Sequence, residues 1–121
     1  MQNKYRNQSY NFTVPNGTAA GAIVPFELVL DSAYSKCIGY AVHKVLNANG
    51  HGVEVYLRDE SEVITDYVHY EHLESTNAVP VSDRYHKALF QAANRKIQIK
   101  AKPIVLLTAD VILQVIFLLE R

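Results

Sequence analysis

The sequence is poor in the residues that build covalent or metal-bound frameworks. Among 121 residues there is one cysteine, Cys37, and there is no tryptophan. A single cysteine excludes an internal disulfide framework and a zinc cluster made of several cysteines. Any metal site would have to use histidine and carboxylate ligands, and we expect no cofactor.

The chain also lacks an excess of charge of either sign. Twelve Lys and Arg residues balance twelve Asp and Glu residues, and the formal net charge at pH 7 is zero. A nucleic-acid-binding domain of this size is normally basic, so we expect no sequence-specific nucleic-acid partner. A neutral protein repels its own copies only weakly, which suits a subunit of a permanent assembly.

Long hydrophobic runs are absent as well. Residues 1–12 contain no apolar stretch, so we expect no secretory signal peptide there. The apolar region 104–119 is interrupted by Thr108, Asp110 and Gln114, and it is shorter than the roughly 20 residues that a membrane-spanning helix needs. We therefore expect no membrane span.

The clearest positive signal is a pair of predicted strands in the last quarter of the chain. Residues 96–102 alternate polar and apolar side chains, which predicts a half-buried strand. The run 111–119 is apolar at both alternations except at Gln114, which predicts a central strand covered on both faces. Together with 104–107, this run offers more apolar surface than one small sandwich hides, so we expect part of it to contact a neighbouring subunit.

Shorter patterns predict further strands, with two ambiguous segments. Residues 10–14, 26–30 and 53–58 alternate clearly, and residues 63–72 are expected to be extended as well. Residues 33–46 fit both a helical stripe and a strand, and Gly39, the β-branched content and the Asn49-Gly50 hairpin signal favour the strand. Residues 85–93 fit a short helix or a strand, and residues 75–83 are the longest irregular stretch.

These patterns predict a single all-β domain. About seven to eight strands at regular spacing, with turn signals between them, are typical of a single jelly-roll-like β-sandwich, with room for one short helix. A chain of 121 residues is long enough for one two-layer core. We assign residues 1–9 to an N-terminal arm and residues 10–121 to the sandwich.

Few side chains are spaced for catalysis. His69 and His72 are separated by two residues, but on a strand they would point to opposite faces, so they are weak metal candidates without a third ligand. Cys37 lies in an apolar segment without a Gly-rich elbow, which indicates a buried and unreactive thiol. We therefore predict no catalytic residue, no bound metal and no enzymatic activity.

Tyrosine is the abundant aromatic residue, with eight tyrosines against four phenylalanines. It combines apolar area with one hydroxyl at low entropic cost, which suits a protein interface or a carbohydrate platform. The scatter of the tyrosines favours an interface, and the lysines of the strand 96–102 fit either a solvated edge or a grip on an acidic neighbour. The predicted interface residues are Tyr5, Tyr10, Phe12, Tyr56, Tyr67, Tyr70, Lys96, Lys100 and Lys102.

Several of these segments together resemble a known family. The polar N-terminal segment, the Gly-Tyr-Ala-Val strand at residues 39–42, and the closing patterns at residues 96–103 and 110–121 resemble small single jelly-roll capsid proteins of tailless icosahedral bacteriophages, especially penton or minor capsid subunits. The resemblance implies a virion component that forms a ring, with a pentamer at a capsid vertex as the expected form. It also implies other capsid proteins as partners, with the arm of residues 1–9 reaching a neighbouring subunit or an inner layer.

Two further functions are open from the residues. A carbohydrate- or receptor-binding β-sandwich would gather two or three of Tyr56, Tyr67 and Tyr70 on one exposed face beside acidic side chains. A small α+β cone-type enzyme would require residues 33–46 to be helical, and it would enclose Asp66 or His69 in a pocket.

Overall fold

The computed structural model describes residues 4–75 and 84–121 and shows an all-β protein. No helix in these two ranges is long and apolar enough to cross a membrane. The predicted all-β fold is confirmed. The elements are β1 (Tyr5–Val14), β2 (Val24–Val29), β3 (Lys36–Leu46), β4 (Val53–Arg58), β5 (Val63–His69), the 3₁₀ helix η1 (Tyr70–Leu73), β6 (His86–Gln91), β7 (Lys96–Pro103) and β8 (Val111–Glu120).

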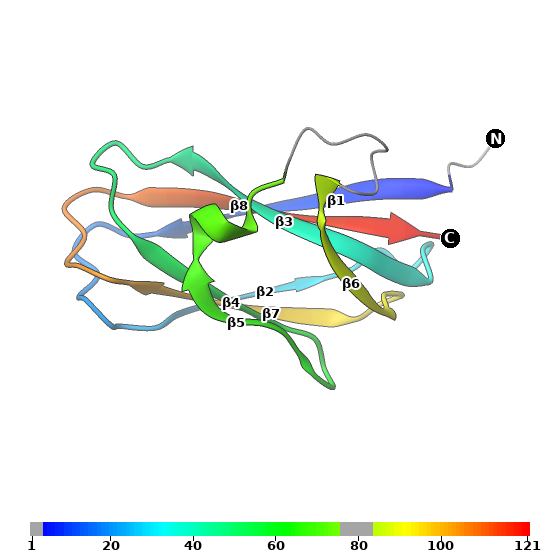
Figure 1. The fold of residues 1–121 in the computed structure, drawn as a ribbon. Helices are drawn as coiled ribbons and strands as arrows, with labels where there is room; N and C mark the ends of the chain where they lie inside the picture. Colours follow the sequence, from blue (N-terminus) through cyan, green and yellow to red (C-terminus); the bar gives the residue numbers. More distant parts are fainter. Residues whose placement is uncertain (1–3, 76–83) are drawn as a thin grey trace.

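The strands form two four-stranded antiparallel sheets that face each other (Figure 1). Sheet A has the order β1-β8-β3-β6, and sheet B has the order β2-β7-β4-β5. The pairs β1–β8, β2–β7, β3–β6 and β4–β5 are all antiparallel neighbours, so the chain is one long hairpin whose two arms are rolled up together. An eight-stranded double sheet wound in this way is a jelly roll.

The core lies between the two sheets, where every second side chain of a strand points. In β7, Ile97, Ile99 and Ala101 are fully buried while Lys96 and Gln98 are exposed, as the alternation predicts. Burying a large aliphatic or aromatic side chain stabilises the fold by about 1.5–3 kcal/mol. The largest fully buried side chains include Phe12, Leu30, Leu57, Ile97, Ile99, Leu107, Leu113, Phe117 and Leu119.

Strand β8 is central in sheet A, between β1 and β3, which confirms the central position predicted for residues 111–119. Its inward side chains, among them Leu113 and Phe117, are fully buried. Of its outward side chains, Leu118 is 5% exposed and Ile112 and Ile116 are half-buried. Contact of this outer face with a second copy stays a prediction.

The two ambiguous segments are strands. Residues 36–46 form β3, and residues 86–91 form β6 beside it. The pairing shifts register between Cys37 and Gly39. A Cβ atom on Gly39 would lie 2.9 Å from the Tyr85 Cβ and 3.2 Å from the His86 carbonyl oxygen, so glycine permits the close approach of β6 to β3. Of the predicted irregular stretch 75–83, residues 76–83 lie outside the described residues.

Part of the segment assigned to an N-terminal arm, residues 1–9, belongs to strand β1. Residues 5–9 form the first half of β1, in continuous register with β8, while residues 1–3 lie outside the described residues. The inward positions of this half are the polar side chains of Arg6 and Gln8, which bond the β2–β3 connection instead of packing in the core. Gln8 donates to the Val29 carbonyl oxygen (3.0 Å) and accepts from the Asp31 N–H (2.8 Å), and Arg6 pairs with Asp31.

The extended segment predicted for residues 63–72 ends earlier, at His69. The next four residues form η1, and the Nδ1 atom of His69 accepts a hydrogen bond from the Glu71 N–H at its start. A 3₁₀ helix has three residues per turn, so Tyr70 and Leu73 lie on the same face, and both are buried. The prediction of an extended segment is therefore wrong for residues 70–72.

The two ends of the described chain lie side by side. Tyr5 pairs with Glu120, and the Arg121 N–H donates to the Lys4 carbonyl oxygen over 2.9 Å. Both ends lie at the right of Figure 1, away from the β1–β2, β3–β4 and β7–β8 loops at the left. The molecule therefore has one end with termini and one end formed by loops.

Candidate interaction surfaces

Cys37 is inaccessible as a nucleophile. Its side chain is fully buried, and the thiol lies 3.4 Å from the Gly39 carbonyl oxygen. Burial raises the pKa of Cys37 to about 12. The thiol therefore stays protonated at neutral pH, as expected from its apolar sequence context.

The two histidines named as weak metal candidates lie near each other without forming a metal centre. The rings of His69 and His72 are perpendicular, with centroids 6.4 Å apart, and His69 also stacks on Tyr70 at 4.8 Å. In residues 4–75 and 84–121, no three His, Cys, Asp or Glu side chains are arranged to hold a metal ion. The Nδ1 atom of His69 is already used by the Glu71 N–H.

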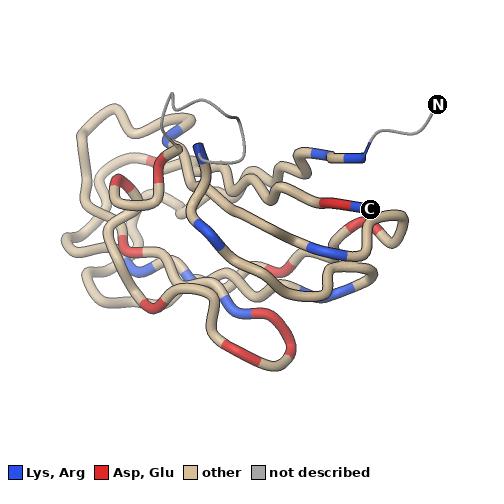
Figure 2. Tube along the Cα trace, turned by 45° about the vertical axis from the view of Figure 1, so that its right-hand side comes forward, with Lys and Arg blue, Asp and Glu red and all other residues tan. Residues whose placement is uncertain are grey.

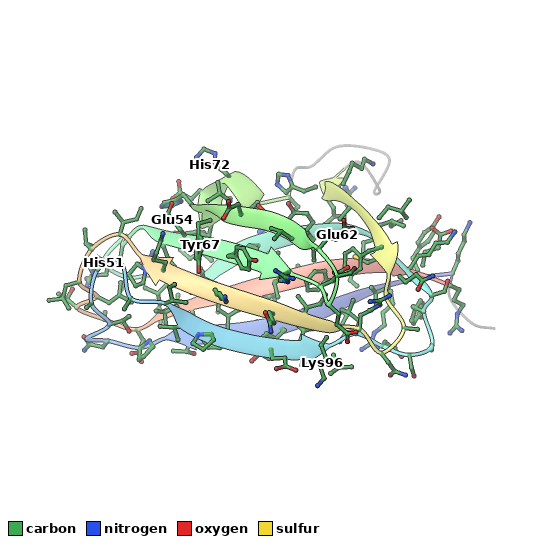
Figure 3. All side chains as sticks on the ribbon, turned by 90° about the horizontal axis from the view of Figure 1, so that it is seen from below. His51, Glu54, Glu62, Tyr67, His72 and Lys96 are labelled. Carbon is green, nitrogen blue, oxygen red and sulfur yellow. The ribbon has the colours of Figure 1, made fainter. Side chains whose placement is uncertain are left out.

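The nine predicted interface residues do not share one surface. Phe12 and Tyr70 are core residues, with 2% and 3% exposure, so they are not available to a partner. Tyr10 is half-buried against Phe12, with ring centroids 6.4 Å apart, and Tyr5 is exposed at the start of β1. The other five gather on the outer face of sheet B, which is turned to the viewer in Figure 3: Tyr56, Tyr67, Lys96, Lys100 and Lys102.

On this face, here called the Tyr–Lys face, aromatic and basic side chains contact one another. The rings of Tyr56 on β4 and Tyr67 on β5 stack with centroids 5.1 Å apart. The Lys100 ammonium lies 5.3 Å from the Tyr56 centroid, and the Lys102 ammonium lies 4.3 Å from the Tyr67 centroid. Lys102 also pairs with Glu54 at 3.6 Å. Stacking and cation–π contacts hold these side chains in a defined arrangement.

The Tyr67 hydroxyl stays protonated over a wide pH range. Burial raises the pKa of Tyr67, and the neighbouring Tyr56, Asp66 and Glu54 add to the increase. The hydroxyl is therefore a hydrogen-bond donor at neutral pH.

A hollow of about 530 Å³ opens beside Tyr56 on the same face. Its lining includes Arg58 on β4, Glu27 on β2, and Gln98 and Lys100 on β7. Side chains of both charges, an amide and one aromatic ring therefore meet in one shallow depression.

A second surface is formed by the loops at the left of Figure 1, residues 15–23, 47–52 and 104–110, here called the loop end. Asp110 is the only residue with a formal charge in these loops. Of the large hydrophobic side chains that are exposed in residues 4–75 and 84–121, more than half lie in these loops or directly next to them. They are Ile23, Val45, Leu46, Ile104, Val105 and Leu106.

Backbone hydrogen bonds join the three loops. Leu107 exchanges bonds with the first loop, since its carbonyl oxygen accepts from Gly17 (2.9 Å) and its N–H donates to Thr18 (3.0 Å). The Ile104 N–H donates to the Gly52 carbonyl oxygen of the second loop over 3.0 Å. The loop end is therefore a connected surface rather than three separate loops.

Polar side chains add to this connection. The Nε2 atom of His51 accepts from the Thr108 N–H (3.2 Å) and lies 2.9 Å from the Thr108 hydroxyl. The Asp110 carboxylate accepts from the Asn16 N–H over 2.7 Å. The one formal charge in these loops is thus engaged within the loop end.

Charge is concentrated at the opposite end. The β4–β5 turn alone contains Asp59, Glu60 and Glu62, and Lys4, Arg6, Glu120 and Arg121 surround the ends of the described chain. Figure 2 shows the charged turn in red, whereas the tips of the loops at the left are tan. The sequence pattern singled out residues 104–107 of the loop end but missed Ile23, Val45 and Leu46, because the fold brings these distant residues together.

No protein-family model matches the chain, and no curated protein has a matching sequence.

Proposed function

We propose that this protein is a capsid subunit of a tailless icosahedral bacteriophage, a penton or minor capsid protein that assembles with its own copies through the loop end. Its role in the virion is structural, without catalysis. Its partners are other copies of the chain and other capsid proteins, and a pentameric ring is the expected form.

The observation that carries the proposal is the chemistry of the loop end. Exposed aliphatic side chains are unfavourably hydrated, and burying them yields about 25 cal/mol per Å² of apolar surface. A contiguous apolar patch on a soluble protein is characteristic of an interaction site, and the centres of interfaces are depleted in charge. Ile104 and Leu106, at 53% and 56% exposure, are therefore expected to lie in such a centre.

A second copy of the same chain is the occupant that fits this surface. An uncharged apolar surface is complementary to another uncharged apolar surface, and the opposite end of the molecule is rich in charge. In a closed ring, loop ends that point toward the common rotation axis lie against one another, each copy using one side of its loop end for each neighbour. The zero net charge of the chain leaves little long-range repulsion between copies.

The hydrogen bonds within the loop end also favour association. Because residues 17, 18, 52, 104 and 107 are already joined, little conformational entropy is lost when the surface is buried, and this preorganisation increases affinity. The eight-stranded jelly roll is a fold of viral capsid domains and of lectins. The fold supports the proposal by analogy, and the loop end supports it by physical chemistry.

Native mass measured by size-exclusion chromatography with light scattering tests the assembly. We expect a native mass at least twice the 13.6 kDa of one chain at tens of micromolar protein. Leu106→Asp should shift the protein to the monomer. Leu89→Asp is the matched control, since Leu89 is 73% exposed on β6 and should leave the mass unchanged. A strict monomer for the unmodified chain would contradict the assembly, and absence of the protein from purified particles would contradict the virion role.

A carbohydrate-binding module is the second candidate function. The observation in its favour is the stacking of Tyr56 and Tyr67 on an exposed face beside Glu54, although Tyr70 is buried and takes no part. The α+β cone enzyme loses its premise, since residues 36–46 form a strand.

A further inference from the structure

The hollow beside Tyr56 has a regular arrangement set by the pairing of β4 and β7. Tyr56 lies opposite Lys100, and Arg58 lies opposite Gln98. These two rows are about 7 Å apart along the strands, and the paired residues are about 5 Å apart across them. The four side chains therefore frame an area with the footprint of one sugar ring, and Glu27 of β2 closes a third side of the hollow.

Around the hollow, the acidic side chains have partners, whereas two of the basic side chains have no carboxylate partner among the described residues. Glu27 pairs with Lys96 at 3.7 Å, and Glu60 pairs with Arg95 at 3.7 Å. Asp59 is occupied by the N–H groups of its own turn. Within the part of the chain that the structure describes, Arg58 and Lys100 have no carboxylate at ion-pair distance. Arg58 and Lys100, the latter with its ammonium over the Tyr56 ring, can therefore each pair with a ligand anion.

This set of groups matches the chemistry of an acidic sugar. The apolar C–H groups of a pyranose pack against aromatic carbon atoms. Here Tyr56, whose ring is held between Tyr67 and the Lys100 ammonium, supplies aromatic carbon at the wall of the hollow. Sugar hydroxyls both donate and accept, and Gln98 offers an amide that does both while Glu27 offers an acceptor. A carboxylate on the sugar would form charge-assisted hydrogen bonds with Lys100 and Arg58, which are stronger than bonds between neutral groups.

We propose that the outer face of sheet B is a binding site for a carboxylated sugar, with Tyr56 as the aromatic wall of the site and Lys100 and Arg58 as the groups that select the negative charge. The proposal rests on the second candidate function, the binding of carbohydrate, and adds its ligand class. It is independent of assembly through the loop end, because the Tyr–Lys face and the loop end use different residues.

A single-stranded nucleic acid also combines stacking bases with anionic groups, but the hollow fits it less well. Glu27, Asp59 and Glu60 line the same depression and would repel a continuous phosphodiester backbone. Nucleic-acid binding depends on neutralising several phosphates in a basic groove, and the net charge of the chain is zero. One carboxylate on an otherwise neutral ligand suits this mixed surface better.

Saturation-transfer NMR with the full chain tests the proposal, with 3′-sialyllactose as the acidic probe, lactose as the neutral probe and an eight-residue oligothymidine as the nucleic-acid probe. We expect 3′-sialyllactose to bind at least fivefold more tightly than lactose, and the oligothymidine not to compete. Lys100→Gln should remove this preference, and Tyr56→Ala should abolish binding. Lys44→Gln is the control, since Lys44 is exposed on β3 of the other sheet.

Each alternative result is decisive. Equal binding of lactose and 3′-sialyllactose would overturn the acidic ligand class while leaving carbohydrate binding intact. Absence of binding to both sugars would overturn both, and displacement by the oligothymidine would assign the face to nucleic acid. Lys100→Gln replaces one surface side chain by another of similar length, and its native mass should match that of the unmodified chain. A loss of sugar binding is thereby separated from a loss of assembly.

Discussion

Asp59 shows how a single buried carboxylate holds a turn of this fold. It is 3% exposed, and its Oδ1 atom accepts from the N–H groups of Ser61 and Glu62, both over 2.7 Å. Burial alone would raise the pKa of Asp59, but these hydrogen bonds outweigh burial, and the pKa lies below its ordinary value of 3.8. The ionised form is therefore favoured in the folded protein.

We expect Asp59→Ala to lower the free energy of unfolding at pH 7 by about 1–3 kcal/mol, the cost of leaving buried donors unsatisfied. Because the folded-state pKa is lowered, this contribution is present above pH 3.8 and is lost as the pH falls through the folded-state value. Urea unfolding at pH 7 and pH 3, at one protein concentration, measures the difference. Glu62→Ala, an exposed residue of the same turn, is the control, and an equal effect of both substitutions at pH 7 would contradict the role of Asp59.

At the level of single residues, the sequence predicted the burial of Cys37 correctly, but it did not predict which aromatic side chains are buried. Cys37 is buried, as its apolar context indicated. Phe12 and Tyr70 were expected in an interface and lie in the core, because alternation shows which residues share a face and does not show which face is covered. Tyr70 also belongs to η1, where alternation does not apply.

Glycines 39 and 52 allow a comparison of close approaches between elements. A Cβ atom on Gly39 would meet the Tyr85 Cβ at 2.9 Å and the His86 carbonyl oxygen at 3.2 Å, and both belong to stiff parts of the chain. On Gly52 it would meet the Ile104 Cδ1 at 2.8 Å, which is the end of a flexible side chain. The first contact has little freedom to relax.

We therefore expect Gly39→Ala to destabilise the protein by about 1–3 kcal/mol, as overpacking does, and Gly52→Ala to cost less. Thermal or urea unfolding of the two variants side by side measures the order. A larger loss for Gly52→Ala would show that β6 moves away from β3 at low cost.

At the level of elements, the strands with strict alternation or long apolar runs were predictable. Those of residues 96–102 and 111–119 appear as β7 and β8. The start of β1 was not predictable, because Arg6 and Gln8 take inward positions as hydrogen-bonding residues, so the hydrophobic pattern that marks a strand is missing there. The end of β5 depends on the side chain of His69 accepting from Glu71, a local bond that alternation does not reveal.

The whole molecule is held together by pairs of strands that are distant in the sequence. Tyr5 pairs with Glu120, and Val24 pairs with Ala101, so the outer strands cannot form before most of the chain is in place. Folds dominated by such pairings fold slowly, in about milliseconds to seconds. The same long-range strand pairing brings the three loops of the loop end together. Composition alone therefore could not predict this surface.

We accordingly expect refolding from urea to take milliseconds or longer. Stopped-flow tyrosine fluorescence measures it, since the chain has eight tyrosines and no tryptophan. Dilute protein keeps association out of the measurement, and a rate that does not change with concentration verifies this. Refolding complete within about 100 µs would show that local contacts, rather than long-range pairing, limit the rate.

The proximity of Lys4 and Arg121, far from the loops, determines where a genetic fusion would emerge. A fluorescent reporter attached after Arg121 would project from the charged end of the molecule, so the loop end would stay unobstructed. Labelled copies could then test whether the protein forms a ring, with the loop end left uncovered.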